Sequence, residues 1–225
     1  MENKRTGKFQ IMPAESVKPI LTAVAIHFIT YYVPKLCLFG RTPVQLNTAI
    51  DDAIPFVPAV MLIYTLIAFG QWTVHYVLLG NWDRKVMFRT ISAEAIAKTI
   101  CMIIFIILPT TIRRPEVGGD GLMNWYCRFI FYMDTPQNLF PSIHCLQSWF
   151  CMRSVFWQKK APRWYQYLQV FVTVIVCVST VLVKQHFVVD IFAGILAAEI
   201  GIYLMKKLKA DEIAENLLTD CEKGK

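Results

Sequence analysis

Long apolar stretches separated by short polar segments run through most of the chain. Several approach the length of about 20 mostly apolar residues that a helix needs to cross the hydrocarbon core of a bilayer. They cover residues 17–38, 55–79, 93–111, 141–157, 165–183 and 187–205. The pattern predicts an all-α fold, a polytopic membrane bundle of six transmembrane helices. We expect a single transmembrane domain at residues 1–210 and a short cytoplasmic tail at residues 211–225.

Two of the predicted helices carry polar residues that membrane segments rarely contain. The fourth contains Gln147 and Arg153 and departs most from the apolar pattern. The third contains Glu94 and Lys98, four residues apart, a spacing at which a carboxylate and an ammonium group can pair on one helix face. His27 lies in the first stretch without a nearby acidic residue or phosphate motif, and we interpret it, like His75, as an interhelical or interfacial polar residue.

The net charge of +7 would be compatible with a nucleic-acid partner, but hydrophobic residues make up 56% of the chain, too many for a soluble domain of this size. When the six helices alternate in direction, most cations fall on one side of the membrane, in the two terminal segments and in the second and fourth loops. The positive-inside rule makes this side cytoplasmic. We therefore expect cytoplasmic termini, the bilayer as a partner and no nucleic acid.

The seven cysteines include no CxxC pair. Cys101, Cys145, Cys151 and Cys177 fall inside predicted helices, where cysteine acts as a small apolar residue. This distribution predicts neither a disulfide framework nor a zinc site, and we expect no metal and no cofactor.

Three short blocks carry candidate chemistry, and the first is the pair Arg113 and Arg114 after the third helix. A guanidinium group matches phosphate oxygens with two parallel hydrogen bonds and stays charged at any working pH. Two of them at a membrane edge could hold a phosphate. A positively charged helix flank is the alternative, and for this block alone it is the commoner explanation.

The second block is Pro141-Ser142-Ile143-His144. Pro141 suits the first turn of a helix, where exposed amide groups form a site for anions. Ser142 could add a hydroxyl donor, and His144 could serve as an acid. The alternative is a structural helix start with a histidine bonded to a neighbouring helix.

The third block runs from Ser179 to Asp190 and contains Lys184 and His186. Because His186 and Asp190 are four residues apart, they share one face of a helix. A carboxylate bonded to one ring nitrogen fixes the tautomer and raises the basicity of the other nitrogen, as a nucleophile or base requires. A structural hydrogen-bonded pair is the alternative, although titratable groups inside a membrane usually mark a functional site.

The predicted topology brings all three blocks to the same, non-cytoplasmic face of the membrane. There they would supply cations for phosphate charge, an activated histidine and a second histidine for the leaving group. These are the parts that phosphoryl transfer needs from a protein. The phosphate-binding set expected from the blocks comprises Arg113, Arg114, Ser142, Ser179 and Lys184.

The order of these blocks resembles the type 2 phosphatidic acid phosphatase (PAP2) superfamily of six-helix membrane enzymes. Its pattern of Lys-x6-Arg-Pro, Pro-Ser-Gly-His and Ser-Arg-x5-His-x3-Asp is similar to residues 114–190. The resemblance implies phosphate binding by Arg114 and Ser142. It further implies that His186 is the nucleophile, Asp190 its partner and His144 the general acid.

The chain departs from the family pattern at three positions, where Ile107, Ile143 and Thr180 replace a lysine, a glycine and an arginine. Lys184 could restore a cation, and the sequence Lys184-Gln185-His186 is similar to a branch that includes inositol phosphorylceramide synthases. The departures leave the substrate more open than the reaction type.

We expect a lipid phosphatase that acts at the outer face of the membrane through a phosphohistidine intermediate. Its substrate would be a lipid phosphate, namely phosphatidate, phosphatidylglycerophosphate or a polyprenyl diphosphate. A lipid phosphotransferase that uses the same histidine is the first alternative. A noncatalytic membrane carrier or scaffold is the second.

Overall fold

The computed structural model describes residues 11–37 and 41–223, and helices dominate this part of the chain. The elements are α1 (Ala14–Leu36), α2 (Ala49–Ala53), η1 (Pro58–Val60), η2 (Ile63–Ile67), α3 (Ala68–Asn81), α4 (Arg84–Ile107), α5 (Leu122–Met133), α6 (Ile143–Trp157), α7 (Arg163–Leu182), α8 (Val188–Leu208) and α9 (Ala210–Lys223). The described ranges contain no strand, so the all-α prediction is confirmed. The basic N-terminal segment and the predicted end of the first span at residue 38 lie outside these ranges.

Within the described ranges, five helical segments are long and apolar enough to cross a membrane. They are Ala14–Leu36, Pro58–Asn81, Arg84–Ile107, Arg163–Leu182 and Val188–Leu208. These helices indicate an integral membrane protein. The predicted count of six spans is not confirmed, because α6 has 15 residues, or about 22 Å at 1.5 Å per residue, and a hydrocarbon core is about 30 Å thick.

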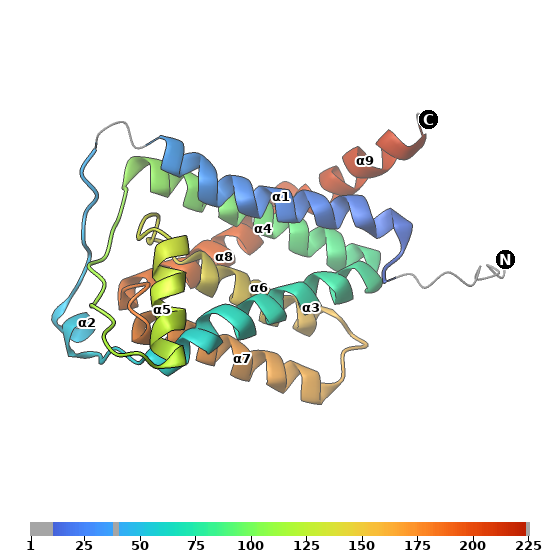
Figure 1. Cartoon of the computed structure of the whole chain (residues 1–225). Coiled ribbons are helices and arrows are strands. Elements are labelled where there is room, and N and C mark those ends of the chain that lie inside the picture. Colours follow the sequence, from blue (N-terminus) through green and yellow to red (C-terminus); the bar gives the residue numbers. More distant parts are fainter. Residues whose placement is uncertain (1–10, 38–40, 224–225) are drawn as a thin grey trace.

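The long helices run roughly along one direction, with α6 packed against α7, α8, α3 and α4 (Figure 1). The largest core cluster joins α4, α6 and α8 and contains Phe105, Phe150 and Met205. Helices α4 and α8 approach closely at Gly201, where an added Cβ would lie 2.6 Å from the carbonyl oxygen of Ala93. The small side chains at this crossing therefore set the distance between the two helices.

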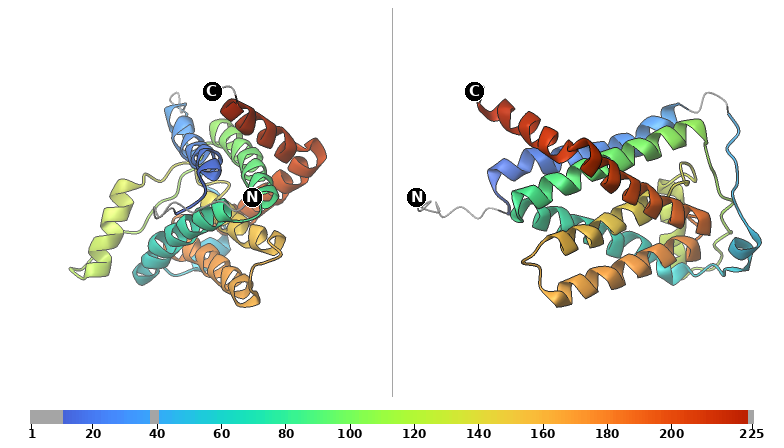
Figure 2. Two further views of the ribbon diagram at one scale, coloured as in Figure 1. Left: turned by 90° about the vertical axis from the view of Figure 1, so that its right-hand side faces the viewer. Right: turned by 180° about the vertical axis from the view of Figure 1, so that it is seen from behind.

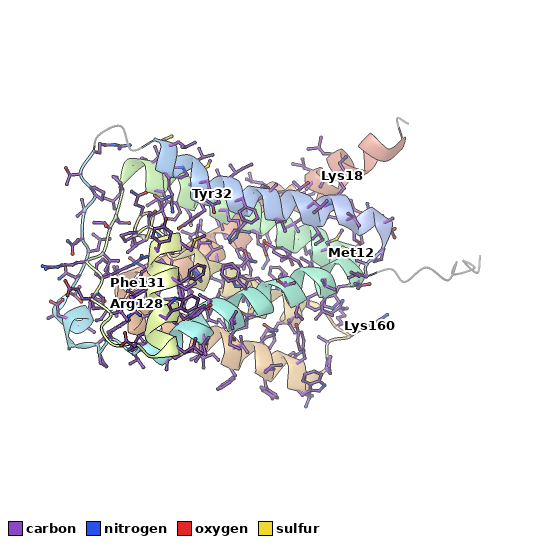
Figure 3. The ribbon with its side chains drawn as sticks, in the orientation of Figure 1. Met12, Lys18, Tyr32, Arg128, Phe131 and Lys160 are labelled. Carbon is purple, nitrogen blue, oxygen red and sulfur yellow. The ribbon has the colours of Figure 1, made fainter. Side chains whose placement is uncertain are left out.

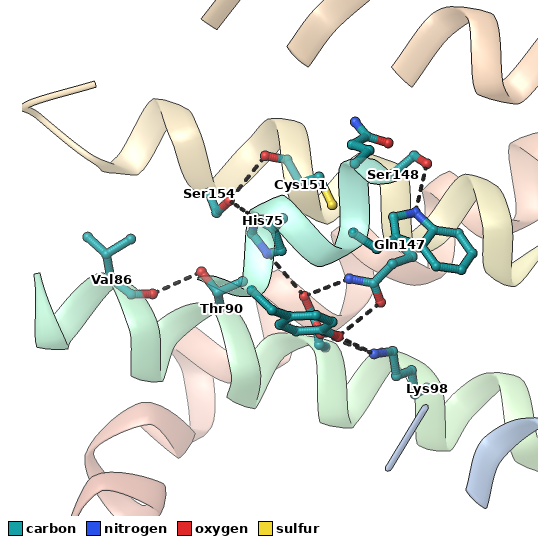
Figure 4. Close-up of polar contacts among 12 residues, drawn as sticks. His75, Val86, Thr90, Lys98, Gln147, Ser148, Cys151 and Ser154 are labelled. Atoms are coloured by element: carbon teal, nitrogen blue, oxygen red, sulfur yellow. Dashed lines mark hydrogen bonds and ion pairs between the residues drawn. The ribbon is translucent and has the colours of Figure 1, made fainter. Parts of the chain in front are cut away.

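Polar residues of α6 face a buried charge cluster rather than lipid (Figure 4). The Lys98 ammonium lies 3.1 Å from the Glu94 carboxylate, and both side chains are almost fully buried. The Gln147 side-chain amide donates to Glu94 over 3.1 Å, and the Tyr76 hydroxyl donates to the same carboxylate over 2.8 Å. His75 Nε2 lies 3.7 Å from Glu94. This cluster ties α3, α4 and α6 together and accounts for Glu94, Lys98 and Gln147, whereas Arg153 of α6 pairs with Glu199 of α8 over 2.8 Å.

The C-terminal segment that the sequence predicts as a tail forms helix α9 beside the start of α4. Arg84 lies 2.5 Å from Glu215, and Arg89 lies 3.4 Å from Asp211. Lys209, with φ of 51°, makes the turn between α8 and α9. The polar composition of α9 concealed its helical structure from a search for apolar stretches.

Two shorter helices lie at the opposite end of the bundle from α9. Helix α5 crosses the direction of the long helices there, and α2 lies close to the same end (Figures 1 and 2). Figure 3 shows Arg128 and Phe131 of α5 at this end, whereas Lys18 and Lys160 lie toward the other. Two of the cations predicted to be cytoplasmic are thus far from α5.

Candidate active site

His186 and Asp190 lie together where α7 turns into α8. The amides of Gln185 and His186 donate to the carbonyl oxygen of Thr180, over 3.0 Å and 3.1 Å, and so form a tight turn after α7. His186 Nδ1 then lies 3.2 Å from Asp190 Oδ2, and the same oxygen accepts the Phe187 amide over 2.9 Å. The buried carboxylate therefore caps α8 and orients the imidazole, which leaves Nε2 to meet a reactant.

His144 lies in the first turn of α6, within an aromatic setting. Its ring stacks on Tyr64 with centroids 4.2 Å apart, and Trp72 lies 5.0 Å away. The ring centroid is 6.0 Å from that of His186. Among the described residues, His144 Nε2 has no hydrogen-bond partner, although it is buried. The two predicted histidines thus face one another, and one ring nitrogen of His144 is free to exchange a proton with a ligand.

Ser142 caps α6 and links it to α8. Its hydroxyl oxygen accepts the Cys145 amide over 3.4 Å, and its own amide donates to the carbonyl oxygen of Asp190 over 3.0 Å. At Gly194, an added Cβ would lie only 2.4 Å from the Ser142 carbonyl oxygen. The absence of a side chain at position 194 therefore lets the start of α6, with His144, approach the helix that carries Asp190.

Replacing Gly194 with alanine is expected to lower activity at least about tenfold while the protein still folds, because the new methyl group must displace the Ser142 backbone. Turnover and thermal unfolding of the purified variant would be measured together. The matched control is Gly70→Ala on α3, where an added Cβ meets nothing within 4 Å. Equal activity of the two variants would contradict the close approach at Gly194.

Arg114 is held by carbonyl oxygens at the end of α5. Its Nη1 donates to the carbonyls of Phe131 and Asp134 over 3.0 Å and 2.5 Å, and its Nη2 donates to the side-chain oxygen of Gln185. The Asp134 carboxylate lies 3.9 Å from Nη2. Burial lowers the pKa of Arg114 and the Asp134 carboxylate raises it, with a net decrease from the ordinary value. The guanidinium is therefore a positive charge bound to Gln185, the residue that precedes His186 in the turn.

The other expected phosphate ligands are distributed differently. The Lys184 ammonium donates to the carbonyl oxygens of Asp51 and Ile54 over 2.7 Å and 2.6 Å. Arg113 is exposed and, like Lys184, lines a cavity that reaches His186. Ser179 is buried, and its hydroxyl donates to the Val176 carbonyl of its own helix over 2.6 Å. The structure therefore brings Lys184 and Arg113 near His186 and turns the Ser179 hydroxyl away.

The three departures from the family pattern have different surroundings. Ile107 ends α4 with 69% of its surface exposed, Ile143 is buried in the core, and the Thr180 hydroxyl donates to the Cys177 carbonyl. Ile143 also lines the apolar cavity at His186, whereas Ile107 and Thr180 line neither of the two cavities there. In this chain, cations reach the site from Arg113, Arg114 and Lys184 instead.

Two cavities of opposite character meet at His186 and Arg114, which line both. One, of about 310 Å³, is mainly apolar and lies between α1, η2, α3 and α5. Its aromatic lining comes from Phe28, Tyr31, Tyr32, Tyr64, Phe69 and Trp72, with both histidines among the other residues. The second, of about 400 Å³, is more polar, with Asp51 and Lys184 in its wall. An apolar chain suits the first cavity, and a charged group suits the second.

Sequence reasoning missed Tyr64, Trp72 and Asp51 at this site. Asp51 accepts the Val188 amide over 2.7 Å and the Thr48 amide over 2.8 Å, and so joins α2 to the start of α8. Burial raises the pKa of its carboxyl, but these hydrogen bonds and the nearby Lys184 lower it more, to a net value below the ordinary one. Asp51 therefore stays ionised beside the cations of the polar cavity.

Comparison with known proteins gives one family match. A family model described as the PAP2 superfamily matches residues 131–204, which include Ser142, His144, His186 and Asp190 but exclude Arg114. No curated protein matches the chain. The family match indicates a phosphatase-type enzyme. It confirms that the chain resembles the PAP2 superfamily, over the segment that carries both histidines of the site.

Proposed function

We propose that the protein is a membrane phosphatase that hydrolyses a lipid phosphate monoester or diphosphate through a phosphohistidine at His186. One observation carries the proposal. His186, 3.2 Å from the buried Asp190 carboxylate, lines both an apolar cavity and a polar one. A lipid phosphate has the same division, with an apolar chain on one side of the reacting atom and a charged group on the other.

In the first step, Nε2 of His186 attacks phosphorus and the bond from phosphorus to the lipid oxygen breaks. His144 donates a proton to the departing alkoxide, and Asp190 stabilises the positive charge that forms on the His186 ring. Arg114, with Arg113 and Lys184 beside the polar cavity, offsets the charge on the nonbridging oxygens, and the amides that open α6 at Ser142 add hydrogen-bond donors. The Ser179 hydroxyl has no part in this step, because it donates to the Val176 carbonyl within α7.

In the second step, water replaces the lipid alcohol. His144, now neutral, takes a proton from the water as the water oxygen attacks phosphorus and the bond from phosphorus to nitrogen breaks. Phosphate leaves, and both histidines return to their starting states. If an alcohol takes the place of water, the same intermediate yields a new phosphate ester.

A lipid phosphotransferase is the second candidate. The polar cavity of about 400 Å³ favours it, because a bare phosphate group would leave much of that space empty. A headgroup attached to the transferred phosphate would fill the space and meet the carboxylates of Asp51 and Asp52. The acceptor therefore decides the class of enzyme.

We propose that the site faces away from the cytoplasm and that both termini are cytoplasmic. Lys18 and Lys160 lie toward the end of the bundle that is remote from α5, and cations mark the cytoplasmic side of membrane proteins (Figure 3). Arg114 and His186 belong to the α5 end. Labelling of single introduced cysteines in intact cells with a membrane-impermeant reagent would test this orientation.

Phosphate release by the purified, detergent-solubilised protein tests the function. The substrates are phosphatidate, phosphatidylglycerophosphate and a polyprenyl diphosphate, each with EDTA present and with His186→Ala in parallel. We expect release by the wild type alone. Product that forms only when a lipid or polyol alcohol is added would establish the phosphotransferase. No product under either condition would overturn both proposals and favour a noncatalytic carrier or scaffold.

A further inference from the structure

Helix α5 exposes a continuous apolar face. Leu122, Trp125, Phe129, Tyr132 and Met133 are all exposed, and their spacing of three, four, three and one residues places them on one side of the helix. Tyr132 exposes 83% of its surface and Leu122 exposes 71%. So many large apolar side chains on one helix face indicate a surface that meets something other than water.

The direction of α5 identifies what it meets. Figure 1 shows α5 running across the long helices, close to the end at which α4 finishes. In the end-on view of Figure 2, α5 projects beside the bundle instead of covering its end. When the five long helices cross a bilayer, α5 therefore lies along the membrane plane, at the level where the hydrocarbon core ends.

The exposed face of α5 continues the surface that the neighbouring helices present to lipid. Tyr32 of α1 and Phe69 of α3 are 56% and 52% exposed and line the apolar cavity that Ile130 and Met133 of α5 also line. Trp125 and Phe129 stack in parallel, with ring centroids 5.7 Å apart. Tryptophan and tyrosine are the residues that membrane interfaces favour.

The flank of α5 has the polarity that an interfacial helix requires. Arg128 donates to the carbonyl oxygens of Val117 and Gly119, each over 2.9 Å, and Asn124 donates to the Gly118 carbonyl. These contacts hold the preceding loop on the polar side of the helix. We infer that α5 is an in-plane membrane helix whose face from Leu122 to Met133 binds the boundary between lipid headgroups and acyl chains.

This placement has a consequence for the site. Arg114 binds the carbonyl oxygens of Phe131 and Asp134 at the end of α5, and its guanidinium lies 4.7 Å from the centroid of the Phe131 ring. The last turn of α5 also walls the apolar cavity. Arg114 keeps these bonds within the chain itself, whereas lipid that seats α5 fixes the wall of the apolar cavity, in which the chain of a lipid substrate would lie.

Quenching of tryptophan fluorescence by brominated lipids tests the placement without any assay of activity. The protein would be reconstituted in bilayers with bromine either near the headgroup or deep in the chain, and wild type would be compared with Trp125→Phe. We expect the component lost in the variant to be quenched at least about twofold more strongly by the shallow bromine. Trp164→Phe is the positive control for a tryptophan at the membrane interface, because Trp164 is exposed at the start of the long apolar helix α7. We expect its component also to be quenched more strongly by the shallow bromine.

Three results would overturn the inference. Quenching by aqueous acrylamide but by neither lipid would place Trp125 in water. Protection from all three quenchers would mean that protein covers α5, either a second copy of this chain or another partner. Stronger quenching by the deep bromine would place the helix within the hydrocarbon core instead of at its edge.

A second measurement examines the link to the site and rests on the proposed function. For the variant Trp125→Ser with Phe129→Ser, we expect KM for a long-chain lipid phosphate in vesicles to rise about fivefold to tenfold. kcat for a soluble short-chain analogue should stay within twofold of wild type. An equal loss with both substrates would overturn the link, and no activity in the wild type would refute the proposed function while the quenching result still stood.

Discussion

Alanine in place of His186 is expected to abolish turnover, whereas alanine in place of His144 is expected to trap the phosphorylated enzyme. Without His186 there is no nucleophile, so kcat should fall by roughly 10⁴ or more. Without His144 the first step still proceeds when the leaving group needs no proton, as in p-nitrophenyl phosphate. The second step then lacks its base and should slow by roughly 10² to 10⁴.

Rapid mixing and radiolabelling would separate the two variants. His144→Ala should release close to one equivalent of p-nitrophenol in a burst and retain label from [³²P]-labelled substrate on the protein, as an acid-labile and alkali-stable bond typical of phosphohistidine. His186→Ala should show neither burst nor label. Asp190→Asn should form the intermediate more slowly, because the amide no longer stabilises a charged His186 ring. Labelling of His186→Ala would show that another residue is the nucleophile.

The spacing of residues predicted one close pair for the right reason and another for the wrong one. Glu94 and Lys98, four residues apart within α4, lie 3.1 Å apart as helical periodicity requires. His186 and Asp190 were expected to share a helix face, but His186 lies in the turn before α8, so that expectation was wrong. The two side chains still lie 3.2 Å apart, because the Asp190 carboxylate caps the start of α8 beside the His186 ring.

Contacts between distant segments could not be predicted in this way. Tyr64, which stacks on His144, precedes it by 80 residues and lies in a stretch that reads only as apolar. Lys184 was expected at the phosphate, yet its ammonium binds carbonyl oxygens that α2 brings to it. The role of each group depends on which helices become neighbours, and periodicity within one helix carries no information about that.

Hydropathy located five of the expected spans and misjudged the segments that are not simply apolar. Helix α6 is short because Ser142 caps its start and its backbone hydrogen bonds end at Gln158. Most of its polar residues are buried against other helices. Helix α5 lies between the third and fourth predicted spans and is not among the predicted helices, although its apolar residues repeat at helical spacing. When hydropathy is averaged over about 20 residues, the length of a membrane span, a helix of 12 residues that lies along the membrane is averaged with its polar neighbours and gives no clear signal.

Replacing Lys98 with methionine is expected to destabilise the protein by about 3 to 5 kcal/mol, the usual cost of breaking a buried ion pair. The Glu94 carboxylate, which is buried, would keep its bonds from Tyr76 and Gln147 but would lose its nearest cation (Figure 4). Unfolding of the purified variant in detergent, followed by circular dichroism, would measure the loss. Lys85→Met, at a residue on the exposed start of the same helix, is the matched control and should change stability by less than about 0.5 kcal/mol.

The double variant Glu94→Gln with Lys98→Met separates the charge pair from the packing. Because it removes both charges and keeps an amide that can bond Tyr76 and Gln147, it should be more stable than Lys98→Met alone by roughly 2 kcal/mol or more. The single variant Glu94→Gln would be measured as well. If the double variant lost as much unfolding free energy as Glu94→Gln and Lys98→Met lose together, direct coupling between Glu94 and Lys98 would be contradicted. Recovery of stability would instead mean that the carboxylate needs its lysine, and that the charge pair selects which faces of α3, α4 and α6 meet at the centre of the bundle.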